Sequence, residues 1–176
     1  MGRNLRVFNF AFVCLLGTVA RAAPHDSCTL PLTLQTEIAR EYPSKKLVRL
    51  SDLSDYKKKL FRKDHGNSCP GVVRVDFYGD GKPTFGLVLI SGQNPHIEVK
   101  FVIAHQIDQT WELRPIESTD GTPVVWREPP GKYEGLYKEE QSFIAKHSVV
   151  VLCGYGSWAI AYAWIDNEVR KVWLSD

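Results

Sequence analysis

The sequence predicts an α+β fold in which two N-terminal helices pack on a mostly antiparallel, meandering sheet. Apolar residues recur every three or four positions before residue 65, which is typical of amphipathic helices. From Gly71 onward they alternate with polar residues, which is typical of strands. Short turn-forming segments separate the alternating stretches, so neighbouring strands are expected to run antiparallel.

The first helix is expected over residues 32–41. Leu30, Leu34 and Ile38 recur every fourth position, and Pro43 ends the pattern. A short strand is expected at 45–50.

The second helix follows Ser51 and Asp52, either of which is a good N-cap. Leu53, Tyr56 and Leu60 mark its apolar face, and the helix is expected to end near Arg62.

Period-two alternation and turn residues define the strands of the sheet. The expected strands are 71–77, 84–91, 97–107, 110–116, 142–147 continuing into 149–153, 157–165 and 168–174. Residues 117–137 are expected to be mostly loop, with a short strand near 124–126. In 157–165, tryptophan, isoleucine and tyrosine side chains form one face, which is expected to face the core. Alanines form the other face, which either faces solvent or lets a helix lie close.

The N-terminus resembles a secretory signal peptide. Arg3 and Arg6 precede an apolar run over 10–16, and Ala20-Arg21-Ala22 offers a peptidase site. The apolar run is too short to span a bilayer. We therefore expect a signal peptide at 1–22 and a single α+β domain at 23–176, periplasmic or secreted, with no membrane insertion after cleavage.

Charge argues against a nucleic-acid partner. The chain has 22 basic and 20 acidic residues, a net charge of +2, and three of the basic residues lie in the leader. The remaining chain has 19 basic and 20 acidic residues, so no global basicity remains. The basic cluster over 57–63 is interpreted as a solvated helix face.

Three cysteines remain after the leader, Cys28, Cys69 and Cys153. One disulfide is the default expectation in an oxidising compartment. Of the three pairings, Cys28–Cys69 is favoured because both residues sit in irregular segments beside the expected helices. Cys153 then remains as a small buried residue in a strand.

Residues 76–84 resemble the calcium loops of FG-GAP, dockerin and related exported modules. Asp76 and Asp80 supply carboxylates at the matching positions, with the Tyr78 carbonyl between them. Tyr78 and Thr84 stand where those loops usually carry further oxygen side chains. A weak calcium site and a plain hairpin turn are the two interpretations, and the turn is favoured.

A second resemblance covers most of the chain. The segments 69–72, 76–83, 86–90 and 173–176 are similar to those of small exported bacterial proteins without known activity. This resemblance implies a bacterial origin and an α+β fold, and it implies no catalytic residue. The opening helix, Tyr42-Pro43 and following strand also resemble PepSY and β-lactamase-inhibitor-like modules.

No complete catalytic set is visible in the sequence. Cys153 with His105 or His147 as base would make a cysteine-dependent hydrolase, but a buried strand is a poor setting for a nucleophilic thiol. His96 and Glu98 are too few to hold a transition metal.

The preferred interaction site is the segment 125–133, with Trp126, Arg127 and Tyr133 among stiff prolines. These side chains either contact a partner or cap the sheet. We predict a non-catalytic binding protein without a cofactor, whose partner is a protein such as an enzyme that it inhibits. The alternatives are a weak calcium-binding structural module and the cysteine-dependent hydrolase.

Overall fold

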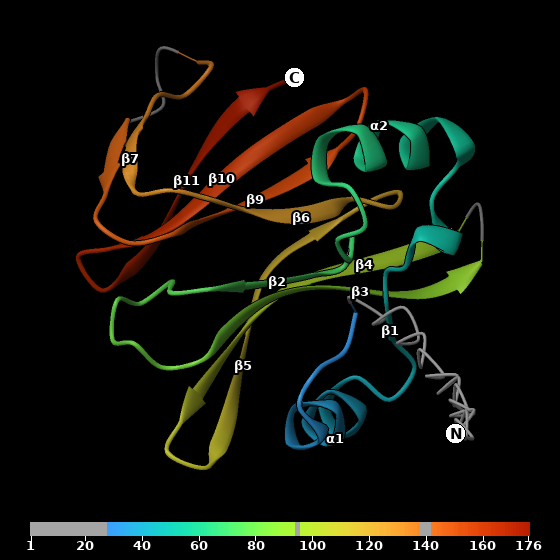
Figure 1. Cartoon of the computed structure of the whole chain (residues 1–176), viewed down its shortest axis with the longest axis horizontal. Helices are drawn as coiled ribbons and strands as arrows, with labels where there is room; N and C mark the ends of the chain where they lie inside the picture. Colours follow the sequence, from blue (N-terminus) through green and yellow to red (C-terminus); the bar gives the residue numbers. More distant parts are fainter. Residues whose placement is uncertain (1–27, 94–95, 138–141) are drawn as a thin grey trace, which may run out of the picture.

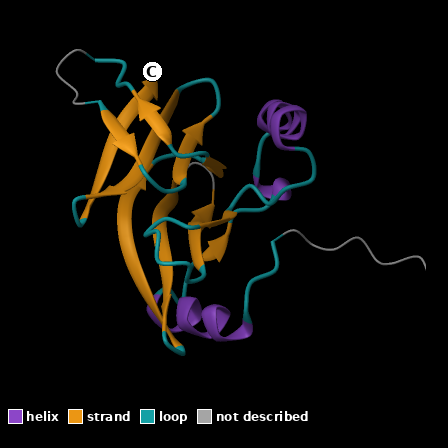
Figure 2. Cartoon of the chain, turned by 60° about the vertical axis from the view of Figure 1, so that its left-hand side comes forward, coloured by secondary structure: helices purple, strands orange, loops and turns teal. Residues whose placement is uncertain are grey.

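The chain has an α+β architecture of two helices and mostly antiparallel strands (Figures 1 and 2). The structure is a computed structural model and describes residues 28–93, 96–137 and 142–176. The expected signal peptide at 1–22 lies outside these residues. Within them, no helix combines the length and apolar character needed to cross a membrane.

Helix α1 spans Leu32–Glu41, where the four-residue spacing predicted it. Leu34 and Ile38 are its buried residues, and they pack on one face of the larger sheet. The indole Nε1 of Trp111 donates to Thr33 Oγ1 at 3.0 Å, which fastens the helix to a strand far along the chain.

Helix α2 spans Asp55–His65, so it begins later than predicted, and of the predicted apolar face Leu53 is buried and Leu60 half-buried while Tyr56 is not. Ser54 is the N-cap and accepts from the backbone N–H of Lys57. Asp52 instead accepts from the N–H of Arg49 at 2.8 Å, which closes the short 3₁₀ helix η1 at Leu50–Asp52. The buried residue of α2 is Phe61, while Tyr56 is 62% exposed.

The larger sheet has the order β1-β3-β4-β5, and β2 pairs with the same edge of β3 as β1. Its strands are β1 Lys46–Leu47, β2 Val72–Val75, β3 Thr84–Gln93, β4 His96–Ile107 and β5 Thr110–Thr119. The strand expected at 45–50 is only two residues long, and η1 begins at Leu50.

The second sheet has the order β11-β10-β9-β6, and β7 pairs with β8 separately. Its strands are β6 Val124–Glu128, β9 Val149–Gly154, β10 Trp158–Ile165 and β11 Glu168–Ser175, with β7 at Gly131–Tyr133 and β8 at Phe143–Ala145. The prediction that 117–137 is mostly loop was therefore wrong. The end of β5 and the two short strands β6 and β7 lie there, and β6 is the short strand that was expected near 124–126.

The larger sheet lies between two hydrophobic cores. Phe85, Leu87 and Leu89 face α1, while Val88 and Ile90 face the second sheet. Strand alternation explains this division, because successive side chains point to opposite faces.

Both faces of β10 are buried. Tyr162 is fully buried on the large-residue face, as the alternation predicted. Ala161 and Ala163 on the other face are also buried, so the alanine face does not face solvent. Trp158 and Trp164, near the two ends of the strand, are half-buried.

Cys28 and Cys69 lie at disulfide distance, with their Cα atoms 4.9 Å apart, which is the pairing that the sequence favoured. The bridge ties the segment before α1 to the segment that leads from α2 into β2. Cys153 is free and buried in β9.

Candidate functional site

The edges of two strands from different sheets approach each other beneath α2. Strand β2 pairs with β3 on one side, and β6 pairs with β9 on one side. At one end the N–H of Val125 donates to the carbonyl of Pro70 at 2.8 Å. In the part of the chain that the structure describes, this is the only backbone hydrogen bond between the two edges. The sheets therefore meet without becoming continuous.

In each of these strands, alternate residues bond to the neighbouring strand of their own sheet, and the residues between them do not. The carbonyl of Gly71 accepts from the N–H of Val88 in β3. Because the hydrogen-bonding residues of an antiparallel strand alternate, the backbone N–H and C=O groups of Val72 and Arg74 point away from β3. The N–H of Val125 donates to Pro70 and not to β9. By the same alternation, the backbone N–H and C=O groups of Arg127 also point away from β9. An unpaired strand edge offers donors and acceptors to another extended chain.

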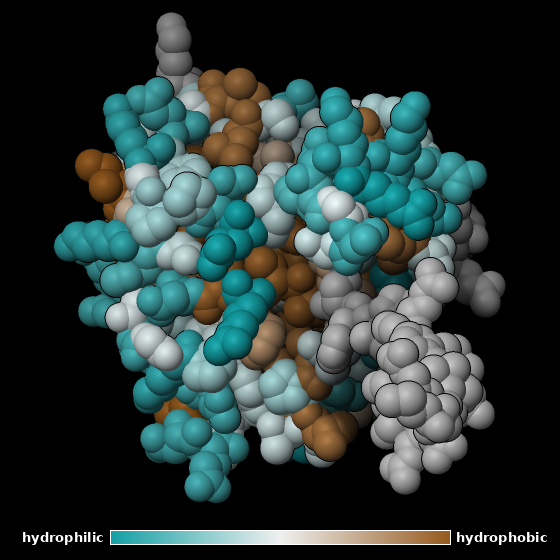
Figure 3. All heavy atoms as spheres, in the orientation of Figure 1, coloured by the Kyte–Doolittle hydropathy of each residue, from teal (hydrophilic) through white to brown (hydrophobic). Residues whose placement is uncertain are grey.

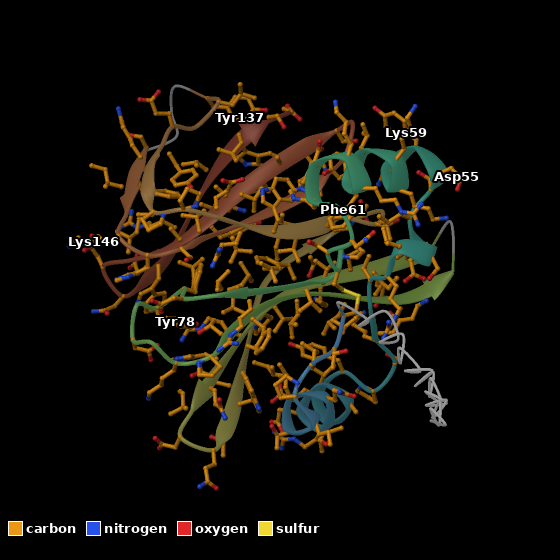
Figure 4. The ribbon with its side chains drawn as sticks, in the orientation of Figure 1. Asp55, Lys59, Phe61, Tyr78, Tyr137 and Lys146 are labelled. Carbon is orange, nitrogen blue, oxygen red and sulfur yellow. A yellow bond between two sulfur atoms is a disulfide. The ribbon has the colours of Figure 1, made fainter. Side chains whose placement is uncertain are left out.

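A groove of about 500 Å³ lies over this junction. The groove is lined from three directions: by α2, by the segment that follows α2, and by the two strand edges. Its lining residues are Phe61, His65, Ser68, Cys69, Val72, Val73, Arg74, Val125, Trp126 and Arg127. Figure 3 shows hydrophobic atoms in the middle of this face beside the hydrophilic surface of α2. Phe61 points from α2 toward the sheets, while Lys59 points away (Figure 4).

Stacked rings form one wall of the groove. The ring of His65 lies 5.0 Å from Phe61 and 4.7 Å from Trp126, between centroids. Trp126 also stacks on Tyr155 at 6.4 Å, and its Nε1 donates to Glu128 at 2.7 Å. These contacts hold the half-buried indole in one orientation, which lowers the entropy lost when a ligand packs against it.

Burial lowers the pKa of His65, and the carboxylates of Asp64 and Glu128 oppose this shift. The imidazole is therefore neutral at neutral pH. Its ring contributes an aromatic surface to the groove rather than a charge.

Two arginines supply the positive charge of the groove. Arg74 and Arg127 are both exposed, and no ion pair or side-chain hydrogen bond is recorded for either one within the described residues. Other basic side chains are paired, as Lys46 is with Asp52 and Lys171 is with Glu117. Sequence reasoning missed Arg74, whose only signal was an arginine between the valines of a short strand.

The structure separates the predicted interaction residues. Trp126 and Arg127 both line the groove. Tyr133 lies on β7, where its hydroxyl donates to the Pro129 carbonyl at 2.6 Å and its ring packs on Phe143. Tyr133 is not among the residues that line the groove, so the segment 125–133 does not form one site.

The Asp76–Thr84 segment forms turns between β2 and β3. Asp76 accepts from the N–H of Gly79 at 3.0 Å, and Asp80 accepts from the N–H of Lys82 at 3.1 Å. The second Asp80 oxygen lies 3.0 Å from His105 Nε2. Within the described residues, no group of three or more His, Cys, Asp or Glu side chains could hold a metal ion.

The pKa of Asp80 is lowered. Partial burial alone would raise it, but the Lys82 N–H and the neighbouring His105 outweigh that effect. Tyr78 packs against His105 and Trp164, at 4.3 and 4.8 Å between ring centroids. The segment is thereby fastened to both sheets, since His105 and Trp164 belong to different ones.

Cys153 lacks the surroundings of a nucleophile. Burial raises the pKa of its thiol to about 11, with opposite smaller effects from Lys57 and Asp64. The two candidate bases lie elsewhere, since His105 contacts Asp80 and His147 lies against Gly79. The structure does not bring the cysteine and either histidine together as a catalytic pair.

The groove thus combines open strand edges, an ordered aromatic wall and two arginines that are free to pair with a ligand. This chemistry suits the binding of an extended polypeptide. Comparison of the chain with known protein families, curated proteins and solved structures found no match.

Proposed function

We propose that the chain is an exported, non-catalytic binding protein and that the groove between α2, β2 and β6 receives an extended segment of a protein partner. An enzyme that it inhibits is the leading kind of partner. The meeting of two unpaired strand edges carries the proposal. Main-chain hydrogen bonds to such edges give affinity, and nearby side chains give selectivity.

Trp126 is the proposed anchor of the interface. Tryptophan and arginine dominate the binding energy of many protein interfaces, especially near a well-packed centre. The indole is held by His65, Tyr155 and Glu128, so it is already ordered before a partner binds. Arg74 and Arg127 border the same groove and extend the contact beyond the aromatic wall.

Export is the second part of the proposal. The leader at 1–22 has the charged, apolar and small-residue regions of a signal peptide. The Cys28–Cys69 pair at disulfide distance fits an oxidising compartment. The resemblance to small exported bacterial proteins adds a bacterial envelope or the medium as the proposed destination.

The test compares partner capture by matched variants. Wild-type protein, Trp126→Ala/Arg127→Glu and Lys59→Glu are immobilised at equal density and exposed to the envelope fraction of the producing cell. Lys59 is an exposed residue of α2 outside the groove lining, so its variant controls for the change of charge. We expect a protein that is retained by wild type and Lys59→Glu and lost from the groove variant. Equal retention by all three would contradict the proposal.

A further inference from the structure

We infer that the groove selects an acidic extended segment, with carboxylates at alternating positions that pair with Arg74 and Arg127. The inference rests on the proposed function, because it names the chemistry of the ligand that this groove takes.

Arg74 and Arg127 are both available to an anionic ligand. Both line the groove and both are exposed, and neither has an ion pair recorded among the residues that the structure describes. Guanidinium groups bind carboxylates with two parallel hydrogen bonds, which are stronger than bonds between neutral groups. An anionic ligand therefore gains charge-assisted hydrogen bonds here without displacing a partner of either arginine within the described residues.

The helix beside the groove, α2, is strongly basic. Helix α2 carries five basic residues, Lys57, Lys58, Lys59, Arg62 and Lys63, against two acids, Asp55 and Asp64. Phe61 and His65 of the same helix line the groove. The chain beyond the leader has one more acid than base, so this positive charge is local. A local field of this kind speeds the approach of an acidic partner and disfavours a basic one.

An extended ligand would present its side chains with a period of two residues. Successive side chains of a strand point in opposite directions, so acids two positions apart lie on one side. The residues between them point to the other side, where the half-buried indole of Trp126 offers apolar surface. A segment that alternates acidic and apolar residues matches both features of the groove.

The probe is a blocked eight-residue peptide of alternating Glu and Val. Matched peptides replace every Glu by Gln or by Lys, and binding is measured by calorimetry at two salt concentrations, on the order of 20 and 200 mM. We expect the Glu peptide to bind at least about tenfold more tightly than the Gln peptide. Binding of the Glu peptide is expected to weaken at the higher salt concentration, and the Lys peptide is expected not to bind.

Three single variants locate the effect. Arg74→Gln and Arg127→Gln are each expected to lose about tenfold in affinity for the Glu peptide. Lys146→Gln, which removes an exposed positive charge that lies outside the groove lining and away from α2, is expected to lose less than about twofold because an exposed charge is screened. The thermal transition of each variant shows that the fold is kept.

Three outcomes would overturn this inference without contradicting the proposed function. Equal binding of the Glu and Gln peptides would overturn the acidic selectivity, and the proposed function would stand if the groove variant still lost its captured partner. Tight binding of the Glu peptide that neither arginine variant weakens would also overturn the inference, because the anion would then bind elsewhere. A captured partner whose contact segment lacks acidic residues would also overturn the acidic selectivity.

Discussion

The ring of His65 lies 4.7 Å from the ring of Trp126, between centroids, and this contact joins α2 to the edge strand β6 of the second sheet. The contact forms the wall of the groove, and Phe61 extends it toward the core. Its two partners are 61 positions apart in the chain. The binding surface therefore exists only after the helix has packed on the sheets.

Acid should weaken the packing of this wall. Burial lowers the pKa of His65 in the folded chain, so the folded state binds fewer protons than the unfolded state near the ordinary histidine pKa. The stability contributed by neutral His65 is present above about pH 6.5 and decreases as the pH falls through that value. We expect the difference in melting temperature between wild type and His65→Phe to change from pH 7.5 to 5.5, with wild type losing more. Parallel pH profiles would contradict this prediction.

Cys153 should be chemically quiet in the native protein. A thiol with a pKa of about 11 is ionised in about one molecule per thousand at pH 8. A thiol reagent should label native protein slowly and label one cysteine per chain after unfolding without reduction. Cys153→Ala should keep partner capture. Rapid native labelling, or loss of turnover of a peptide or ester substrate in Cys153→Ala, would favour the hydrolase alternative.

Removal of the Cys28–Cys69 bridge should destabilise the fold. The two cysteines are 41 positions apart, and closing a loop of that size stabilises by about 4 kcal/mol in the chain-entropy model. Cys28→Ser/Cys69→Ser should lower the free energy of unfolding by roughly this amount in urea. Cys153→Ser serves as the control for replacing a cysteine outside the bridge. Three reactive thiols in unfolded, unreduced protein would contradict the pairing.

Gly86 should tolerate no side chain. A Cβ there would lie 2.9 Å from Val73 Cγ1 and 3.1 Å from Val150 Cγ1, in the space between the two sheets. Gly86→Ala should cost about 1–3 kcal/mol of stability through overpacking. Gly131→Ala is the matched control, because a Cβ there would meet nothing within 4 Å. Equal denaturant midpoints for the two variants would show that the sheets are less tightly packed than described.

The Asp76–Thr84 segment should behave as a turn rather than as a calcium site. The pKa of Asp80 is lowered in the folded chain, so its stabilising effect is present above about pH 4 and is lost as the pH falls below that value. Asp80→Asn should cost less than about 1 kcal/mol, since the carboxylate is partly exposed. Millimolar calcium should leave the melting temperature unchanged. A calcium-dependent rise that Asp80→Ala abolishes would support the metal-binding alternative.

Local patterns predicted the regular elements well. Helix α1 followed from a four-residue spacing, and the hairpin of β10 and β11 followed from alternation around Asp166-Asn167. Both turn residues have positive φ, 51° and 64°, which Asp and Asn adopt more readily than most residues. Local chemistry is sufficient in such places because the neighbouring residues in sequence are also neighbours in space.

The predictions failed where tertiary contacts decide the structure. Asp52 was expected to cap α2, but it closes η1 by accepting from Arg49, and Ser54 caps α2 instead. Trp126 and Arg127 were identified as interaction residues from their types. Arg74 and His65 were not, because the sequence alone gives no reason to place a lone arginine of β2 beside β6. The groove is assembled from four segments, and no local pattern reports their meeting.

Photo-crosslinking from single positions tests the groove most directly. Arg127→Cys and Lys59→Cys are labelled with the same photoreactive maleimide, mixed with the captured partner and irradiated. Both residues are exposed, but only Arg127 lines the groove. The account predicts a cross-link from position 127 to an extended segment of the partner and little or none from position 59. A cross-link from position 59 with none from position 127 would contradict it.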